Sequence, residues 1–147
     1  MVTAWPPDPI PRRSVLLRIV GLGVDIVEIA RIERAILRVP GLVERVFTRG
    51  EISYCRSKPG SQYAHFAGRF AAKEAVAKAI GRSLGWREVA VENDPLGKPA
   101  TVLTGRAAEA ARGGKVLLSI SHSRDYAVAH AVFMANDQGG PYEHVHW

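Results

Sequence analysis

The apolar and polar positions of the chain change period several times, and the β-type segments lie on either side of a long helical region. Between Ile19 and Ile26, β-branched residues are interleaved with glycines, which predicts a strand that other backbone can approach closely. Later segments are short runs of alternating or β-branched residues bounded by turn residues. The predicted strands cover residues 19–26, 89–92, 99–103, 116–121 and 126–134.

Helical spacing dominates the middle of the chain. From Val27 to Val39 the apolar residues recur every three or four positions, and Pro40-Gly41 ends the pattern. Thr48, with Glu51 three residues later, forms a capping box that predicts the start of a short helix. The predicted helices cover residues 27–39, from 48 to the Pro59-Gly60 break, 61–81, and from 104 or 105 to 111. Sequential strand pairs with helices between them indicate an α+β domain, with helices packed on a mainly antiparallel sheet.

The helix predicted over 61–81 has two unlike faces when it is projected at about 100° per residue. One face carries large apolar side chains, and the other is a strip of small ones. The strip contains Ala64, Gly68, Ala71, Ala72, Ala75 and Ala79. Between the faces stand Arg69 and Lys73 on one flank and Glu74 and Lys78 on the other. Because ionised groups on a largely buried helix are costly unless they are paired or bind something charged, chemistry is expected here.

Composition indicates one domain per chain. The 147 residues are 47% hydrophobic and 23% charged, which fits a single globular domain. Cys55 is the only cysteine, which excludes an internal disulfide and a zinc cluster built on cysteine pairs and suggests a reducing compartment. The formal net charge is +6 and the sequence pI is ≈ 9.9, so acidic or polyanionic partners are expected.

The two ends of the chain differ from the segment between them. Residues 1–18 hold four of the nine prolines, and Gly139-Gly140-Pro141 breaks any regular element after Met134. The expected organisation is a flexible leader at 1–18, one folded domain at 19–134 and a flexible tail at 135–147. No segment has the pattern of a secretion signal or a membrane span, so we expect a cytoplasmic location and no membrane partner.

Three short islands carry candidate chemistry: residues 21–25, 70–75 and 119–123. Each alone also fits an ordinary role. Asp25, at a strand end, could cap a helix, and the Lys73-Glu74 step could be a solvated face. His122, in a serine-rich turn, could be a hydrogen-bonded turn residue.

Taken together and in order, these islands resemble the holo-acyl-carrier-protein synthase family, the short type of phosphopantetheinyl transferase. The resemblance extends from Ile19 to about Val132, is sharpest over residues 67–79, and includes residues 47–51 and 97–99. It implies an enzyme that transfers the 4'-phosphopantetheine group of coenzyme A to a serine of apo acyl carrier protein, releasing adenosine 3',5'-bisphosphate. Such an enzyme acts in fatty acid biosynthesis.

The resemblance also implies site residues. Asp25 and Glu74 match the two acids that bind Mg²⁺ in the family. Lys78, one turn beyond Glu74, can reach phosphates held by the same metal and is assigned charge stabilisation. By similarity, His122 helps to hold the phosphates and Arg69 contacts the 3'-phosphate of the nucleotide.

Two roles stay open at this point. Lys73 either binds a phosphate of the coenzyme or pairs with a neighbouring carboxylate. The general base is not identified by the sequence, although Glu74 acting through a metal-bound water is one possibility.

The resemblance further implies two kinds of protein contact. The first helix of the family meets an acidic helix of the carrier protein, Arg31 matches a docking arginine there, and Arg34 and Arg38 extend the same stripe. A solvated face with Glu28 and Glu33 as partners is the alternative for those two arginines.

Short members of the family are homotrimers with active sites between adjacent subunits. That arrangement would help to explain the strip of small residues and would cover Phe66 or Phe70 if either were exposed. An ordinary core that absorbs both phenylalanines is the simpler account without the resemblance.

Two other functions compete with this one. A small basic protein could hold nucleic acid through its arginine stripe. Aromatic residues make up only 7% of the chain and no run interleaves them with Lys or Arg, so no nucleic-acid partner is expected. A nucleotide-binding module that has lost catalysis would keep the region of Arg69, but it should not retain both Asp25 and Glu74.

Overall fold

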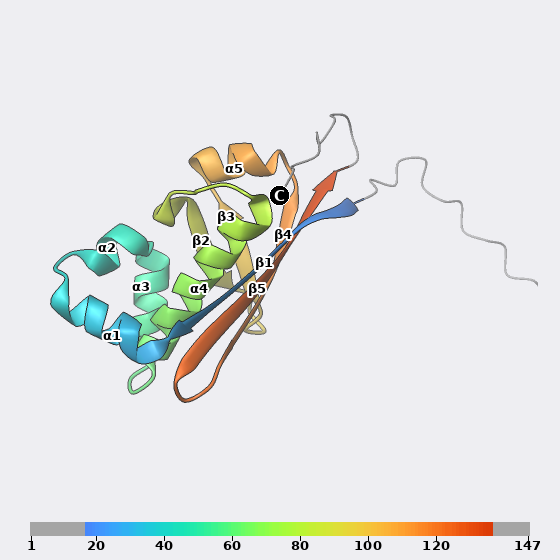
Figure 1. The fold of residues 1–147 in the computed structure, drawn as a ribbon. Coiled ribbons are helices and arrows are strands. Elements are labelled where there is room, and N and C mark those ends of the chain that lie inside the picture. The colour runs from blue at the N-terminus through green and yellow to red at the C-terminus, as the bar shows by residue number, and fades with distance from the viewer. Residues whose placement is uncertain (1–16, 137–147) are drawn as a thin grey trace, which may run out of the picture.

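Three antiparallel strands and a separate hairpin form the β part of the protein, and the computed structural model describes residues 17–136 (Figure 1). The strands are β1 (Leu17–Glu28), β2 (Val89–Asn93), β3 (Pro99–Leu103), β4 (Lys115–His122) and β5 (Tyr126–Asn136). The helices are α1 (Ile29–Arg38), α2 (Leu42–Val46), α3 (Arg49–Arg56), α4 (Gln62–Ile80) and α5 (Gly105–Ala111), with a 3-10 turn η1 (Trp86–Glu88). The α+β class and the antiparallel sheet are confirmed.

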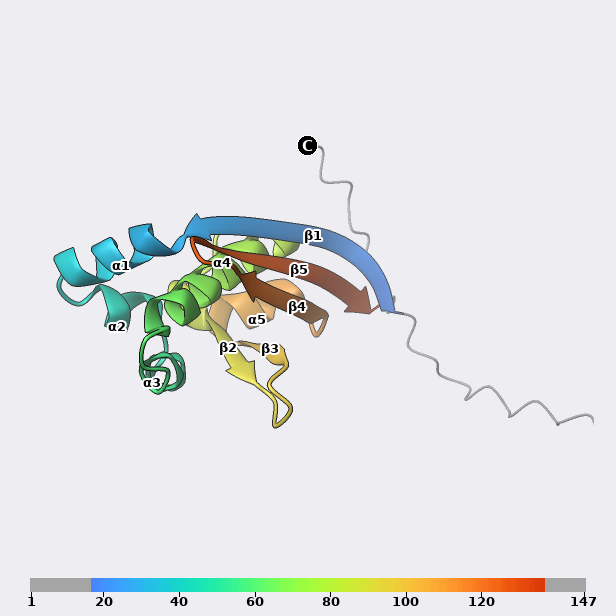
Figure 2. The same cartoon turned by 90° about the horizontal axis from the view of Figure 1, so that it is seen from below.

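The larger sheet has the order β1-β5-β4, so β1 and β4 are its two edges within the described chain. β5 pairs antiparallel with both neighbours. The long helix α4 packs on one face of this sheet, and Figure 2 shows it beneath β1 and β5. The β2–β3 hairpin forms a second, two-stranded sheet.

Glycines in β1 let the strand lie directly on the backbone of α4. A Cβ atom added at Gly23 would stand 1.8 Å from the carbonyl oxygen of Ala75, and one added at Gly21 would stand 1.9 Å from that of Ala79. Only glycine fits at such distances. The strip of small residues on α4 therefore packs against the sheet of its own chain, not against a partner subunit as the resemblance suggested.

The two phenylalanines of α4 are accommodated within the chain. Phe66 is buried against Phe47, with ring centroids 4.9 Å apart. Phe70 is half-buried and stacks on Trp86 at 5.0 Å. The simpler account, an ordinary core, is the one that the structure gives.

The boundaries of several elements differ from the predictions. β1 continues to Glu28, because it pairs with β5 as far as Tyr126 and Ile29 N–H donates to the Asp125 carbonyl. The following helix therefore begins at Ile29 and not at Val27. Helix α2 was not predicted, since five residues are too few to show a period.

Most of the predicted leader and tail lie outside the described residues. Residues 17–18 and 135–136, which the sequence assigned to them, belong to β1 and β5. None of the helices in the described range has the length and apolar character needed to cross a bilayer.

The sheet face that turns away from α4 is apolar and exposed. Leu22, Val24 and Ile26 alternate with the glycines that face α4, and they are 62%, 57% and 65% exposed. Leu117 on β4, 51% exposed, shares this face, because Leu22 and Leu117 both pair with Val132 of β5. We call Leu22, Val24, Ile26 and Leu117 the apolar sheet face; an exposed patch of this kind commonly marks an interface.

Candidate active site

A carboxylate and an ammonium from distant parts of the sequence meet at the β1 edge of the sheet. The Lys78 ammonium lies 3.0 Å from Asp25 Oδ1 and also donates to the Val24 carbonyl at 3.0 Å. The side chain of Asp25 is 18% exposed and that of Lys78 is 52% exposed. The pair is therefore held at a fixed place while a ligand in solvent can reach it.

Glu74 lies on the same flank of α4, one turn before Lys78. Its side chain is half-buried and makes no ion pair or hydrogen bond with the other described residues. The next residue, Ala75, is the one on which Gly23 packs, so Asp25 and Glu74 flank the point where β1 crosses α4.

This edge offers two carboxylates and one cation. No group of three or more His, Cys, Asp or Glu side chains that could enclose a metal occurs between residues 17 and 136. That count does not conflict with Mg²⁺, which usually binds proteins through one or two carboxylates and keeps water and phosphate oxygens as its other ligands.

A second, cationic cluster lies at the β4 edge. The Arg69 guanidinium stacks on the ring of Tyr54 at 3.9 Å, and its Nη2 donates to Asn93 Oδ1 at 2.6 Å. Arg69 is only 4% exposed, and its Nε is a buried donor that finds no acceptor in the described part of the chain. The ring of His65 lies 5.8 Å from that of His122.

The electrostatics of this cluster fit an anion. Burial is the largest cause that lowers the pKa of His65, followed by the nearby charges of Arg69, His122 and Lys58. None of these side chains forms an ion pair with a carboxylate among residues 17–136. We call Lys58, His65, Arg69 and His122 the cationic cluster.

The two clusters are far apart within one chain. Asp25 lies on edge strand β1 and His122 ends edge strand β4, with β5 between them. On α4, Arg69 and Lys78 are separated by about 13 Å of helical rise and lie on different flanks. The structure thus brings Asp25 and Lys78 into contact and places Glu74 on the same flank of α4 as Lys78, but it does not bring Arg69 or His122 to them.

Lys73 is paired inside the protein. Its ammonium lies 2.9 Å from Glu51 Oε2 and also donates to the carbonyls of Trp86 and Val89, and the side chain is 2% exposed. Burial lowers the pKa of Lys73, while the charge of Glu51 acts in the opposite direction. All three N–H donors of the Lys73 ammonium are used within the chain. The sequence left two interpretations of Lys73 open, and the structure shows the pairing with a carboxylate. The predicted contact of Lys73 with the nucleotide is corrected accordingly.

The arginines of α1 form an exposed stripe. Arg31, Arg34 and Arg38 are exposed, and none lies within ion-pair distance of a carboxylate in the described chain. Glu28 and Glu33 therefore form no ion pair with the stripe. Because α1 follows directly from β1, the stripe begins six residues beyond Asp25.

His65 and Tyr54 were not singled out from the sequence. Tyr54 lies on α3 and meets the α4 side chains only through tertiary packing, which no local pattern reveals. His65 could have been found, because it stands four residues before Arg69 and therefore on the same flank of the helix.

Comparison with known proteins agrees with this architecture. A family model described as the 4'-phosphopantetheinyl transferase superfamily matches residues 21–131, a range that includes both clusters. The chain therefore belongs to the 4'-phosphopantetheinyl transferase superfamily.

Within that superfamily the chain groups with the holo-[acyl-carrier-protein] synthases. One such synthase, from Clostridium novyi, is 43% identical over 127 residues, covering 82% of this chain and 91% of the relative. Another, from Clostridium acetobutylicum, is 48% identical over 119 residues, covering 76% of this chain and 94% of the relative.

Solved structures of such synthases share the fold. The holo-(acyl-carrier-protein) synthase of Bacillus anthracis, in complex with CoA (3',5'-ADP), matches with a TM-score of 0.70 and 36% identity, covering 82% of this chain and all of that one. The synthase of Helicobacter pylori in complex with coenzyme A matches with a TM-score of 0.68 and 30% identity, covering 76% of this chain and 98% of that one.

Proposed function

We propose that this enzyme transfers the 4'-phosphopantetheine group of coenzyme A to a serine of an apo acyl carrier protein and releases adenosine 3',5'-bisphosphate. Membership of the transferase superfamily gives the reaction class, and two of the similar structures carry coenzyme A or its nucleotide part. The observation in this chain that carries the proposal is the Asp25–Lys78 pair with Glu74 on the same flank of α4.

Asp25 and Glu74 are the residues that would hold Mg²⁺. Both supply carboxylate oxygens, the ligands that this ion prefers, and Mg²⁺ is usually bound by only one or two protein carboxylates. When bound, the ion would neutralise charge on the pyrophosphate of coenzyme A.

The remaining chemistry falls to side chains of the chain. The serine hydroxyl attacks the β-phosphorus, the bond to the leaving phosphate breaks, and the leaving group keeps the electron pair. Lys78 stabilises the charge that develops on the phosphate oxygens. Glu74 has no ion-pair partner among the described residues, so its carboxylate would orient the water that takes up the serine proton.

Carrier protein would dock on α1. Arg31, Arg34 and Arg38 are exposed and form no ion pair in the described chain, and the stripe lies next to the strand that carries Asp25. An acidic partner would be steered there by complementary charge, mostly through its association rate.

A homotrimer with shared active sites accounts for the separation of the two clusters. A nucleotide held at Asp25 and Lys78 of one copy would reach Arg69 and His122 only if a second copy placed its β4 edge there. Such a head-to-tail contact closes into a ring of identical interfaces. The apolar sheet face supplies the buried surface that this ring needs.

Transfer can be tested with apo carrier protein, coenzyme A and Mg²⁺, by following the added arm with mass spectrometry. Asp25→Asn and Glu74→Gln should each lower the turnover by about 100-fold or more, whereas Glu44→Gln, an exposed carboxylate on α2, should leave it unchanged. Wild-type turnover in either variant would remove that residue from the proposed metal site.

Sharing between subunits is tested by mixing two inactive variants. Asp25→Asn lacks the β1 half of the site, and His122→Ala lacks the β4 half. Random co-assembly should give about a quarter of the interfaces two intact halves, and thus restore a measurable share of the turnover. A mixture that stays as inactive as its components would refute the shared site.

A further inference from the structure

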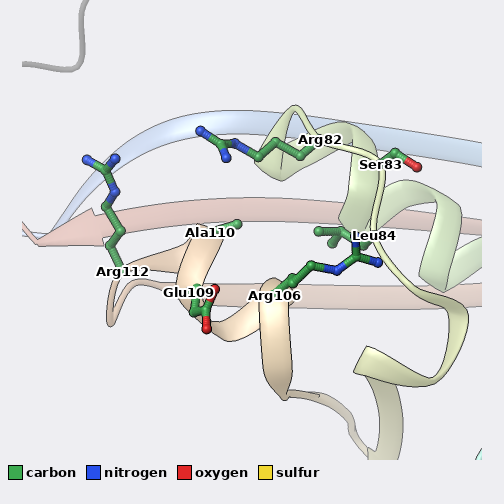
Figure 3. Close-up of a pocket in the computed structure, with 7 residues that line it drawn as sticks. All are labelled: Arg82, Ser83, Leu84, Arg106, Glu109, Ala110 and Arg112. Carbon is green, nitrogen blue, oxygen red and sulfur yellow. The ribbon is translucent and has the colours of Figure 1, made fainter.

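A third group of basic side chains, which the proposed reaction does not use, surrounds a cavity beside the C-terminal end of α4. The cavity has a volume of about 310 Å³. Its lining residues are Arg82, Ser83, Leu84, Arg106, Glu109, Ala110 and Arg112. Figure 3 shows Arg82 extending from the segment after α4, Arg106 and Glu109 on α5, and Arg112 extending from the turn beyond α5.

The charge in the cavity is unbalanced. Three guanidinium groups face one carboxylate, that of Glu109. Arg106 forms a long, exposed ion pair with Glu88 at 3.4 Å, while Arg82 and Arg112 form none with the residues from 17 to 136. Guanidinium groups bind phosphate through two parallel N–H donors, and Leu84 and Ala110 give the cavity apolar surface for the rest of a small molecule.

The backbone at Arg112 is an outlier that favours a role for its side chain. Arg112 has φ 46°, and it is the only non-glycine residue with positive φ in the described chain. Glycine adopts this left-handed conformation at no steric cost, and an L-residue does not. A non-glycine side chain at a strained backbone position is a candidate for function.

Helix-end electrostatics do not account for the whole group. Arg82 follows the end of α4, where its N–H and that of Gly81 donate to the Ala77 carbonyl, and Arg112 caps the end of α5. Basic side chains at these positions also favour the helix dipoles. Arg106, however, lies in the first turn of α5, where the dipole disfavours a cation, and yet it faces the same cavity.

The cavity lies apart from the docking stripe. β1 runs antiparallel to α4, with Gly21 on Ala79 and Gly23 on Ala75, so α1 continues away from the end of α4 that carries Arg82. A carrier protein bound on α1 would therefore leave the cavity open.

We propose that this cavity is a second anion site, distinct from the coenzyme site, and that it takes a small phosphate-bearing molecule held by Arg82, Arg106 and Arg112. The proposal does not depend on the transferase assignment.

The test is a titration of the intact, isotope-labelled protein with inorganic phosphate, followed by the backbone amide signals. Signals of Ser83 and Ala110 should shift and saturate. Arg82→Gln should weaken the affinity derived from them by about tenfold, the usual size for one charge-assisted contact, while Arg45→Gln, an exposed arginine on α2, should not change it. Shifts confined to the amides around Asp25 and Lys78, or equal affinity in Arg82→Gln, would overturn the proposal.

Arg112→Gly separates binding from folding. Because glycine relieves the left-handed strain, the melting temperature should rise by about 2–4 °C while the phosphate affinity falls by about tenfold. A variant that is more stable and binds phosphate as well as the wild type would show that Arg112 has no part in the site.

Saturating coenzyme A distinguishes the source of the phosphate. We expect it to leave the phosphate-induced shifts of Ser83 and Ala110 in place. Loss of these shifts would show that the coenzyme itself fills the cavity and would overturn the separate site. The signals report on the cavity whether or not the protein transfers phosphopantetheine, so failure of one proposal does not imply failure of the other.

Discussion

Replacing Lys73 with Met should lower the free energy of unfolding far more than replacing a surface lysine does. The Lys73 ammonium and the Glu51 carboxylate are 2% and 1% exposed and lie 2.9 Å apart. The same carboxylate accepts from the N–H groups of Thr48 and Val91 at 2.8 and 2.9 Å. Without Lys73, Glu51 keeps these two hydrogen bonds but becomes a buried, uncompensated charge.

The expected loss is about 3–5 kcal/mol, the range measured when one partner of a buried pair is removed. That is a large part of the total stability of an ordinary domain, roughly 5–15 kcal/mol. The urea midpoint should fall by about 2 M for a protein of this size. Lys115→Met, an exposed lysine on β4, should move it little.

The measurement is urea unfolding followed by circular dichroism at one protomer concentration, because the apparent stability of an oligomer depends on concentration. In the double variant Glu51→Gln/Lys73→Met the losses should not add, and the coupling free energy should be about 1–3 kcal/mol. An unchanged midpoint together with a raised KM for coenzyme A would refute the reasoning and return Lys73 to the nucleotide contacts.

Three further predictions concern other parts of the molecule. Gly23→Ala should lower the free energy of unfolding by at least the ~1–3 kcal/mol of ordinary overpacking, because its Cβ would stand 1.8 Å from the Ala75 carbonyl oxygen. Gly50→Ala, at a helical site with open space, should instead raise it by about 0.5–1 kcal/mol in the same urea assay. Burial and neighbouring cations hold the pKa of His65 below 6.5, so the unfolded chain takes up the proton first as the pH falls. The free energy of unfolding should therefore rise with pH in the window just below 6.5, and it should rise less steeply in His65→Gln. Arg31→Glu should raise the KM for carrier protein by about tenfold and leave that for coenzyme A nearly unchanged, and equal effects on both would contradict docking on α1.

Local signals in the sequence predicted much of the fold. The capping box at Thr48 is confirmed, since its hydroxyl accepts from the Glu51 N–H while the Glu51 carboxylate accepts from the Thr48 N–H. The further role of Glu51 could not be predicted, because its partner Lys73 is 22 residues away and no local pattern connects two buried ions. Propensity and capping describe a helix end, whereas tertiary packing decides what else its carboxylate binds.

The apolar sheet face could have been predicted. Leu22, Val24 and Ile26 alternate with Gly21 and Gly23, and a strand that places glycines against a helix must turn its large apolar residues to the other face. A period of two with glycine on one side thus indicates both a close helix and an exposed face. The sequence alone could not tell which helix covers the glycine face, because that depends on where α4 packs.

The same close packing has a consequence for the assembly. Because β1 lies directly on the backbone of α4, the reach of Lys78 to Asp25 is fixed at one edge of the sheet. The N-terminal half of the helix lies on β4, because a Cβ atom added at Gly68 would stand 3.0 Å from Cγ2 of Ile120. This half carries Arg69 to the opposite edge of the sheet. Since α4 is one rigid element, Arg69 and Lys78 stay about 13 Å apart along the helix axis and on different flanks. In the proposed homotrimer, a nucleotide that is held by both clusters would lie between two copies of the chain, and the mixing of Asp25→Asn and His122→Ala subunits therefore tests the assembly as well as the site.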